Sequence, residues 1–338
     1  MKAIKLERPQ KIACVDIEMP IPAKGEALIK VKAAGICGSD IGAYRGNNPL
    51  VSYPRIIGHE IVGEIVSIPM DNSRSLKVGD RVIVDPYLYC GSCYPCSIKR
   101  TNCCCDLKVL GVHVEGGMAE YFTHPADMLI KLPDELPWEL APLAEPLTIA
   151  LHGIHRGKLK AGEHVVIIGA GPIGLLAAMA ALTYGAIPIL VDIVGERLHA
   201  ANSMGVKYII NSSQENPVEK IFKYTAGRMA ELVMECSGSN AAIKSTLDYV
   251  SNAGRITLTG WPKTETSIAT DKIIKKEVDI SGARTSVDEF EEAIRLIASG
   301  AVDAKQILTK TVSLDEASEI IKDIEANPGN YMKVNVLL

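Results

Sequence analysis

A cluster of cysteines in the first third of the chain has the spacing of a metal site. The pattern is C-x2-C-x2-C-x7-C, formed by Cys90, Cys93, Cys96 and Cys104. Four thiolates at short spacing suit a closed tetrahedral zinc site, which leaves no position open for a substrate. The pattern therefore predicts structural zinc. Cys103 and Cys105 flank the fourth position, so spacing alone leaves the choice of that ligand open by one residue.

Two other uses of these cysteines are less consistent with the sequence. The bacterial ferredoxin run begins with the same spacing but continues x3-C-P, which is absent here. Disulfides are the second alternative. The chain has nine cysteines, an odd number, and its first ten residues, MKAIKLERPQ, contain no apolar signal region. Clustered cysteines in a long chain without an export signal favour metal over disulfides.

A second set of metal-ligand residue types is scattered along the chain. Cys37 lies in GICGSD, His59 and Glu60 lie in IIGHEIVGEIV, and Glu145 lies in PLAEPLTIA. A catalytic zinc needs about three protein ligands and one open position, and this mixture of Cys, His and Glu would supply it. Nothing in the local sequence brings the segments together. Taken alone, His59 is more typical of a structural histidine, and Glu145 of a surface or capping residue.

The segment from Gly169 to Gly174, GAGPIG, has the form G-x-G-x-x-G. It follows an apolar strand-like run and opens a helical one, which is the context of a dinucleotide-binding turn. The glycines permit a tight turn and close approach of a pyrophosphate, and the helix N-terminus offers free N–H groups to the anion. Pro172 fits the first helical turn, where its missing donor has no partner in any case.

An acidic residue is expected about 20 residues beyond this turn, where it holds a ribose hydroxyl. Asp192, in ILVDI, ends the next strand-like run and meets that expectation. A carboxylate accepts hydrogen bonds from the ribose diol and repels a 2′-phosphate, so NAD is favoured over NADP. The alternative is a glycine-rich structural turn beside a solvated aspartate.

The pattern of strand and helix signals along the chain changes near residue 160. Residues 1–150 contain short strand patterns separated by turn-forming residues, which predicts an antiparallel β domain. Beyond residue 160 strand and helix patterns alternate, which predicts a doubly wound parallel sheet. The segment from about 288 contains two helical patterns and a final strand, KVNVLL. A chain of 338 residues has the length of roughly two domains.

Composition excludes several classes of protein. The residues are 47% hydrophobic and 22% charged, as in ordinary globular proteins, and the net charge is −4, so no basic surplus points to nucleic acid or to an anionic membrane. The uncharged run from Val165 to Val191 has the length of a membrane span. Its glycines and prolines divide it into strand, turn, helix and strand, so we expect a buried parallel strand and crossover helix instead. We expect a cytoplasmic protein.

Taken together, these motifs resemble the zinc-dependent medium-chain alcohol and polyol dehydrogenase family. The matching segments are GICGSD (35–40), GHEIVGEI (58–65), the four-cysteine lobe, VEGGMAEY (114–121), EPL (145–147) and GAGPIG (169–174). They occur in the family's order, and the resemblance covers the whole chain. The glutamate before Pro-Leu is similar to the sorbitol and threonine dehydrogenase branch. Three further segments, NNPLVSYPRIIGHE, KRTNCC and VLGVHVEGG, resemble a bacterial group that includes the starvation-sensing protein RspB and L-galactonate 5-dehydrogenase. Those proteins are linked to polyols and sugar acids.

The resemblance implies a GroES-like β-rich catalytic domain over residues 1–150 with a zinc lobe at about 88–106. A Rossmann domain over 151–286 and a return to the catalytic domain over 287–338 complete the expected fold. Two zinc ions and NAD are the implied cofactors. The implied nucleotide-binding residues are Gly169, Gly171, Pro172, Ile173, Gly174, Asp192 and Arg197.

The resemblance also implies roles for the metal-ligand residues that are scattered along the chain and for their neighbours. Cys37, His59 and one glutamate hold the catalytic zinc, with Glu60 and Glu145 competing for the last place. Ser39 would bond the substrate oxygen and begin the proton path, and Asp40 would orient His59. Within the lobe, the family's spacing selects Cys104 as the fourth structural ligand.

Arg284, in SGARTS, falls where the polyol branch has an arginine near the nicotinamide, and it is the candidate partner for a substrate carboxylate. Many relatives carry a histidine five residues after the zinc cysteine, whereas this chain has Gly42.

The implied activity is hydride transfer between NAD and a secondary alcohol of a polyol or sugar acid, in a homodimer or homotetramer. Alternatives are a threonine-type dehydrogenase, an NAD-binding regulatory protein that has lost catalysis, and a scaffold built around the zinc lobe. The complete ligand set argues against lost catalysis, and the size of the remaining chain argues against a scaffold.

Overall fold

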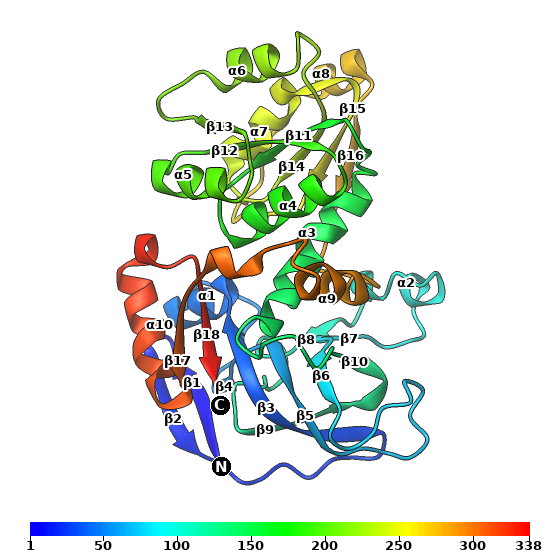
Figure 1. Cartoon of the computed structure of the whole chain (residues 1–338), viewed down its shortest axis with the longest axis vertical. Coiled ribbons are helices and arrows are strands. Elements are labelled where there is room, and N and C mark those ends of the chain that lie inside the picture. The colour runs from blue at the N-terminus through cyan, green and yellow to red at the C-terminus, as the bar shows by residue number, and fades with distance from the viewer. The chain divides into compact units, whose positions relative to one another are not determined.

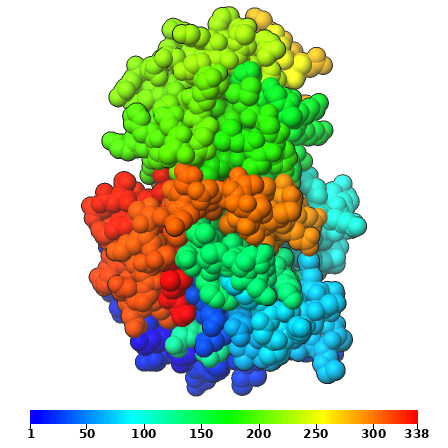
Figure 2. Space-filling view, viewed as in Figure 1, coloured from blue at the N-terminus to red at the C-terminus, as the bar shows by residue number.

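The computed structural model describes all residues from Met1 to Leu338 (Figure 1). The chain divides into two compact units. The first contains Met1–Glu145, Phe290–Ala298 and Ala304–Leu338, and the second contains Pro146–Glu289 and Ser299–Asp303. The amino-terminal and carboxyl-terminal segments thus belong to one unit, where they lie side by side at its surface (Figure 2).

The first unit is built on β-sheets that pack around one apolar core. Its strands are β1 Lys2–Arg8, β2 Lys11–Asp16, β3 Glu26–Ile36, β4 Arg55–Ile56, β5 Glu60–Ser67, β6 Arg81–Val84, β7 Tyr87–Leu88, β8 Lys108–Val109, β9 Tyr121–Pro125, β10 Leu129–Lys131, β17 Leu308–Ser313 and β18 Lys333–Leu337. Its helices are α1 Gly38–Arg45, α2 Tyr94–Ser97, α9 Phe290–Ala298 and α10 Ala317–Ala326.

The longest strand of this unit, β3, is the centre of its main sheet. The strand order is β10-β6-β5-β3-β18-β17, and β9 also pairs with β3. All pairings of β3 are antiparallel. Alternate side chains of β3, such as Ala27, Ile29 and Val31, are buried in the core, as expected for a strand with one face toward the interior. The carboxyl end of β3 therefore leads out of the core directly into Cys37.

The second unit contains a six-stranded parallel sheet in the order β13-β12-β11-β14-β15-β16. Its strands are β11 His164–Ile168, β12 Ile187–Asp192, β13 Tyr208–Asn211, β14 Ala230–Glu235, β15 Val250–Leu258 and β16 Asp279–Gly282. Its helices are α4 Pro172–Thr183, α5 Gly195–Ser203, α6 Pro217–Tyr224, α7 Asn240–Tyr249 and α8 Thr270–Lys276, and α3 Ala144–Arg156 leads into it from the first unit.

Helices α4 and α5 lie on one side of this sheet, and α6, α7 and α8 on the other (Figure 1). The predicted doubly wound parallel sheet is confirmed, with the strand order reversing beside β11. The uncharged run from Val165 to Val191 covers β11 except its first residue, all of α4, and β12 except its last residue, as its glycine and proline pattern predicts. None of the helices combines the length and apolar composition that a membrane crossing requires.

His124, on β9, is a polar residue buried within the first unit. Its side chain is 1% exposed, Nε2 lies 2.8 Å from the Asp85 carbonyl oxygen, and the ring stacks on Phe122. Burial lowers the pKa of His124 to about 4, because the charged imidazolium loses its hydration inside the protein. This histidine is therefore neutral in the folded protein over the range in which an exposed histidine titrates.

The depressed pKa predicts an acid-sensitive contribution to stability. The contribution is fully present above pH 6.5 and is lost as the pH falls toward 4, because the unfolded chain takes up the proton first. We expect the free energy of unfolding to fall by about 2 kcal/mol more between pH 7.5 and pH 5 in the wild type than in His124→Gln. Urea denaturation at both pH values measures the difference. Substitution of the exposed His199 by Gln is the control, and an equal pH dependence in all three proteins would contradict the assignment.

Candidate metal centres and nucleotide site

Pairing between β3 and β5 brings the first three scattered ligand residues together. Gly35 of β3 lies opposite Glu60 of β5 in the antiparallel register, so Cys37, which follows β3, lies close to His59, which precedes β5. The ligand atoms of Cys37, His59 and Glu60 all lie within 4.8 Å of one another. His59 and Glu60 are buried, and Cys37 is half-buried. The main sheet thus forms this group from two segments, and 21 residues lie between Cys37 and His59 in the sequence.

Gly35 makes room for the Glu60 side chain. A Cβ atom at position 35 would lie 1.8 Å from Glu60 Oε2. Two non-bonded atoms cannot approach so closely, so any larger residue would displace the carboxylate. The glycine in GICGSD is therefore explained by the close approach of Glu60 to the strand.

Asp40 lies in the first turn of α1, three residues after Cys37. Its carboxylate accepts a hydrogen bond from the Cys37 amide at 2.9 Å, while His59 Nδ1 has no hydrogen-bond partner. One oxygen of Asp40 therefore caps α1, and the role of Asp40 in orienting His59 stays a prediction. Its charge still acts on His59. Burial disfavours the charged imidazole, but Cys37, and then Asp40 and Glu145, hold the pKa of His59 well above its usual value.

Glu60 and Glu145 have different partners. One oxygen of Glu60 accepts from the ammonium group of Lys333, on β18, and its other oxygen, Oε2, has no partner. Glu145, at the start of α3, accepts from the hydroxyl of Tyr87 and lies outside the 4.8 Å group. Burial raises the pKa of the Glu145 carboxyl to about 7, although the nearby His59 acts in the opposite direction.

Three polar atoms at this site are buried and lack partners: His59 Nδ1, Glu60 Oε2 and Ser39 Oγ. A buried polar atom without a partner costs about 1–3 kcal/mol, so such atoms are rare unless something further binds them. A thiol, an imidazole and a carboxylate form the mixed donor set typical of catalytic zinc. These residues therefore fit a zinc ion.

The cysteine lobe forms a second group. The sulfur atoms of Cys90, Cys93, Cys96 and Cys104 lie within 4.8 Å of one another, with Cys93 Sγ 3.4 Å from Cys96 Sγ and 3.8 Å from Cys104 Sγ. Backbone amides of Cys90 and Asp106 each donate to Cys104 Sγ at 3.3 Å. Such N–H groups stabilise thiolate, the form that binds metal. Four gathered sulfurs of this kind fit zinc.

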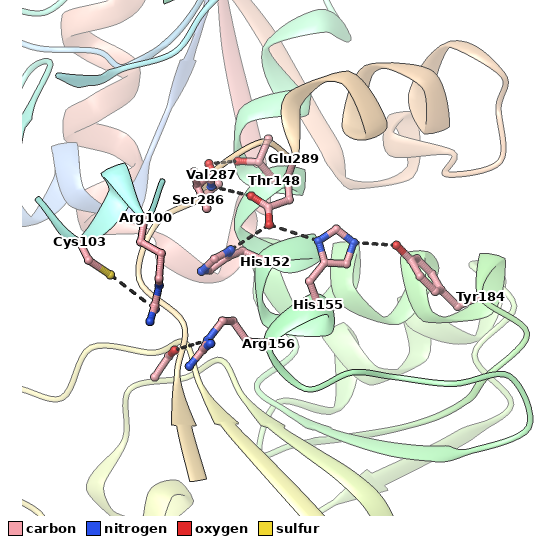
Figure 3. A network of polar contacts seen from close by, with 11 residues as sticks. Arg100, Cys103, Thr148, His152, His155, Arg156, Tyr184, Ser286, Val287 and Glu289 are labelled. Carbon is pink, nitrogen blue, oxygen red and sulfur yellow. Dashed lines mark hydrogen bonds and ion pairs between the residues drawn. The ribbon is translucent and has the colours of Figure 1, made fainter. Parts of the chain in front are cut away.

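Cys103 and Cys105 lie outside this group. The Arg100 guanidinium donates to Cys103 Sγ at 3.6 Å, in a contact drawn in Figure 3. The structure therefore gathers Cys104, and not either neighbour, with the other three cysteines.

The nucleotide turn lies between β11 and α4. Gly171 caps α4, and Pro172 is its first residue. A Cβ atom at Gly174 would lie 1.7 Å from the carbonyl oxygen of Gly169, so only glycine lets the helix approach the turn this closely. Ile173 follows Pro172 in the first turn of the helix. The free N–H groups at the start of α4 thus lie at the carboxyl end of the parallel strands.

Asp192 ends β12, next to this turn. Its Oδ2 accepts from the Ala170 amide at 2.5 Å, and its Oδ1 accepts from the amides of Ile193 and Val194 at 2.7 and 2.8 Å. The carboxylate therefore also holds the turn against the neighbouring strand, a role that its position in the sequence does not indicate. Arg197 lies in the first turn of α5, just beyond Asp192.

Arg284 lies in the segment that follows β16, and polar contacts with α3 fix this segment (Figure 3). Glu289 Oε1 lies 2.8 Å from His152 Nδ1 and 3.2 Å from His155 Nδ1, and Thr148 Oγ1 donates to Ser286 Oγ at 2.8 Å. These α3 residues are spaced at 148, 152 and 155, on one helix face. The sequence shows this spacing, but it does not show that these side chains contact the segment from Ser286 to Glu289.

Sequence reasoning also missed Lys333 and Tyr87. Lys333 lies in KVNVLL, where a lysine begins an apolar strand, and it is only 4% exposed. A charged residue in such a strand is a signal, since a buried lysine needs a partner. The identity of that partner, Glu60, is not readable from the sequence.

The family models match two parts of the chain. The alcohol dehydrogenase GroES-like domain matches residues 23–134, and the zinc-binding dehydrogenase domain matches residues 172–299. The chain therefore belongs to the zinc-dependent medium-chain alcohol dehydrogenase family, and it is an enzyme of that family. The expected combination of a GroES-like domain with a parallel-sheet dinucleotide-binding domain is confirmed.

Individual relatives extend the match to the full chain. An uncharacterized zinc-type alcohol dehydrogenase-like protein of Haemophilus influenzae is 56% identical over 100% of this chain and 98% of its own. The starvation-sensing protein RspB of Escherichia coli is 36% identical over 99% and 98%. A crystal structure of rspB from E. coli CFT073 with NADH has a TM-score of 0.93 at 35% identity, covering 100% and 99% of the two chains.

The lobe geometry predicts that Cys104 and Cys103 differ in their effect on metal content. We expect Cys104→Ser to lose about one equivalent of zinc and to lower the melting temperature, because structural zinc contributes directly to folding energy. Cys103→Ser should keep both properties, since its sulfur lies outside the group. Elemental analysis and thermal denaturation measure the two effects. Equal zinc content in both variants would contradict the grouping.

Proposed function

We propose that this enzyme oxidises a secondary alcohol of a polyol or sugar acid with NAD, with Cys37, His59 and Glu60 as ligands of its catalytic zinc. The observation that carries the proposal is the group of three donors, two of them buried, with unpartnered atoms at His59 and Glu60. Among relatives, L-galactonate-5-dehydrogenase of E. coli is 36% identical and sorbitol dehydrogenase of Bacillus subtilis is 35% identical.

Glu60 is favoured over Glu145 as the third ligand. One of its carboxylate oxygens lies within 4.8 Å of the donor atoms of Cys37 and His59, whereas Glu145 is outside this group and accepts from Tyr87. The ammonium group of Lys333 donates to one oxygen of Glu60, and the other oxygen remains available to a metal ion. When bound, zinc supplies Lewis-acid chemistry, which lowers the pKa of an alcohol hydroxyl and so favours hydride donation.

Ser39 is the group that receives the substrate proton in this proposal. It lies two residues after Cys37, and its Oγ is buried without a partner. A hydroxyl both donates and accepts, so Ser39 can bond the substrate oxygen and pass its proton onward. The chain has Gly42 where many relatives carry a histidine, so either water or another group must continue the path from Ser39, or the proton relay is slower.

The cofactor is NAD, bound at the turn from Gly169 to Gly174 and at Asp192. The N–H groups at the start of α4 suit the pyrophosphate. The negative charge of Asp192 suits a ribose diol and opposes a 2′-phosphate. Arg197 contributes to the adenosine end of this site.

Arg284 distinguishes the two substrate classes. A sugar acid carries a carboxylate, and a guanidinium binds a carboxylate through two parallel hydrogen bonds. A plain polyol needs no such partner. Arg284 is therefore the residue whose substitution separates sugar acids from polyols.

The proposed activity is tested by following absorbance of NADH at 340 nm with a panel of aldonates, uronates, alditols and threonine. We expect turnover with a sugar acid or alditol, and with NAD in preference to NADP. Ser39→Ala should lower turnover by roughly 10²-fold or more, the usual scale of a lost acid–base group. Its zinc content and NAD affinity should be unchanged. Threonine as the preferred substrate, or wild-type turnover in Ser39→Ala, would contradict the proposal.

The assignment of the third ligand predicts opposite metal contents for two glutamate variants. Glu60→Gln should lose the catalytic zinc, since a neutral amide is a much weaker ligand than a carboxylate. Glu145→Gln should retain it, because its partner is Tyr87. Elemental analysis, with the lobe zinc as an internal standard, measures both. Loss of zinc from Glu145→Gln alone would reverse the assignment.

A further inference from the structure

The segment from Gly282 to Glu289 is held at both of its ends by helix α3. At its start, Nε of Arg156 donates to the Gly282 carbonyl oxygen at 3.1 Å. At its end, Oε1 of the buried Glu289 lies 2.8 Å from His152 Nδ1 and 3.2 Å from His155 Nδ1 (Figure 3). All of these residues belong to the second unit. One helix therefore fixes both ends of a short segment that contains no helix or strand of its own beyond Gly282.

Between these two attachments the backbone adopts conformations that its residues rarely take. Thr285 has a φ of +47° and Asp288 has a φ of +66°, both in the left-handed region. A β-branched residue such as threonine is an outlier there, and such conformations persist only where the surrounding structure determines them. The attachments to α3, and not the local preferences of the segment, therefore determine its backbone.

The Glu289 carboxylate is the centre of the second attachment. Its Oε2 accepts from the Val287 amide at 2.6 Å, and its Oε1 faces Nδ1 of both histidines. An ionised carboxylate only accepts, so the Nδ1 atoms of His152 and His155 carry protons and donate to it. His155 Nε2 then accepts from the Tyr184 hydroxyl at 2.9 Å. One carboxylate thus joins the segment's own backbone to two turns of α3.

We propose that Glu289 is a positioning residue that orients Arg284 toward a substrate carboxylate and so favours sugar acids over polyols, a role that rests on the proposed function. Arg284 is exposed and directly precedes Thr285, so its direction follows from the backbone that Glu289 holds. Two parallel hydrogen bonds to a carboxylate require one orientation of the guanidinium, and fixing that orientation in advance reduces the entropy lost on binding. A polyol makes no such pair, so its binding does not depend on Glu289.

Glu289→Gln is the variant that tests this role, because it preserves the shape of the side chain. The new amide NH2 must face either the Val287 N–H or the two histidine Nδ1–H groups, so at least one donor loses its acceptor. His155→Phe is a milder second variant, since it removes one donor from an exposed position. It should show the same change of selectivity in weaker form.

The kinetic experiment uses the zinc-loaded full chain with NAD, as wild type, Glu289→Gln, Arg284→Gln and the double variant. The substrates are the aldonate with the highest turnover and the alditol with the same carbon chain, which differ in one terminal carboxylate. For Glu289→Gln we expect KM of the aldonate to rise roughly tenfold, with its kcat and both constants of the alditol changed less than about twofold. The double variant should equal Arg284→Gln, because Glu289 acts through Arg284.

Hydrogen exchange followed by mass spectrometry tests the positioning role without any substrate. The amides of residues 283–288 should exchange several-fold faster in Glu289→Gln than in the wild type, while those of β11 and β12 stay unchanged. Glu277→Gln is the matched control, because it removes the same charge from an exposed position after α8. It should match the wild type in both experiments.

Two kinds of failure are distinguishable. An equal rise of both KM values, additive effects in the double variant, or unchanged exchange of residues 283–288 in Glu289→Gln would overturn the positioning role. Absence of aldonate and alditol turnover in the wild type would instead contradict the proposed function, and faster exchange in Glu289→Gln would then still support the hold of Glu289 on the segment.

Discussion

The antiparallel pairing of β3 with β5 is the constraint on which the group of Cys37, His59 and Glu60 depends. It sets Gly35 opposite Glu60, and the next residues along each strand then bring Cys37 beside His59. A shift of register by one residue would send every side chain of a strand to the opposite face, so the buried side chains of β3 in the core also fix the geometry of the site. The same strand register therefore determines both which side chains of β3 enter the core and where the ligand residues lie.

The candidate site also depends on a buried ion pair between Glu60 and Lys333. Both side chains are almost fully enclosed, at 0% and 4% exposure. Such a pair contributes little net stability, but removal of one partner leaves an uncompensated buried charge and costs about 3–5 kcal/mol. Lys333 comes from the last strand, β18, which lies beside β3. The carboxyl-terminal segment therefore supplies the cation that pairs with the Glu60 carboxylate.

Helix α3 serves the two units in different ways. Its first turn supplies Glu145, which accepts from Tyr87 in the first unit. Later turns supply Thr148, His152 and His155, which hold the segment from Ser286 to Glu289 in the second unit (Figure 3). Hydrogen bonding to these histidines keeps the pKa of Glu289 below its usual value despite burial, so the carboxylate remains an acceptor. The position of the segment carrying Arg284 thus depends on side chains more than 130 residues earlier.

Local signals in the sequence determined the parallel sheet, the nucleotide turn and the short-spaced cysteines. In each case the chemistry resides within one segment, where glycine spacing or x2 spacing fixes the geometry directly. The long-range contacts were decided only in the tertiary structure. The partner of Lys333 and the difference between Glu60 and Glu145 depend on register and on the path of the chain. Those are set by packing of the whole unit, because a side chain's neighbours across a sheet or loop leave no mark on the residues adjacent to it in sequence.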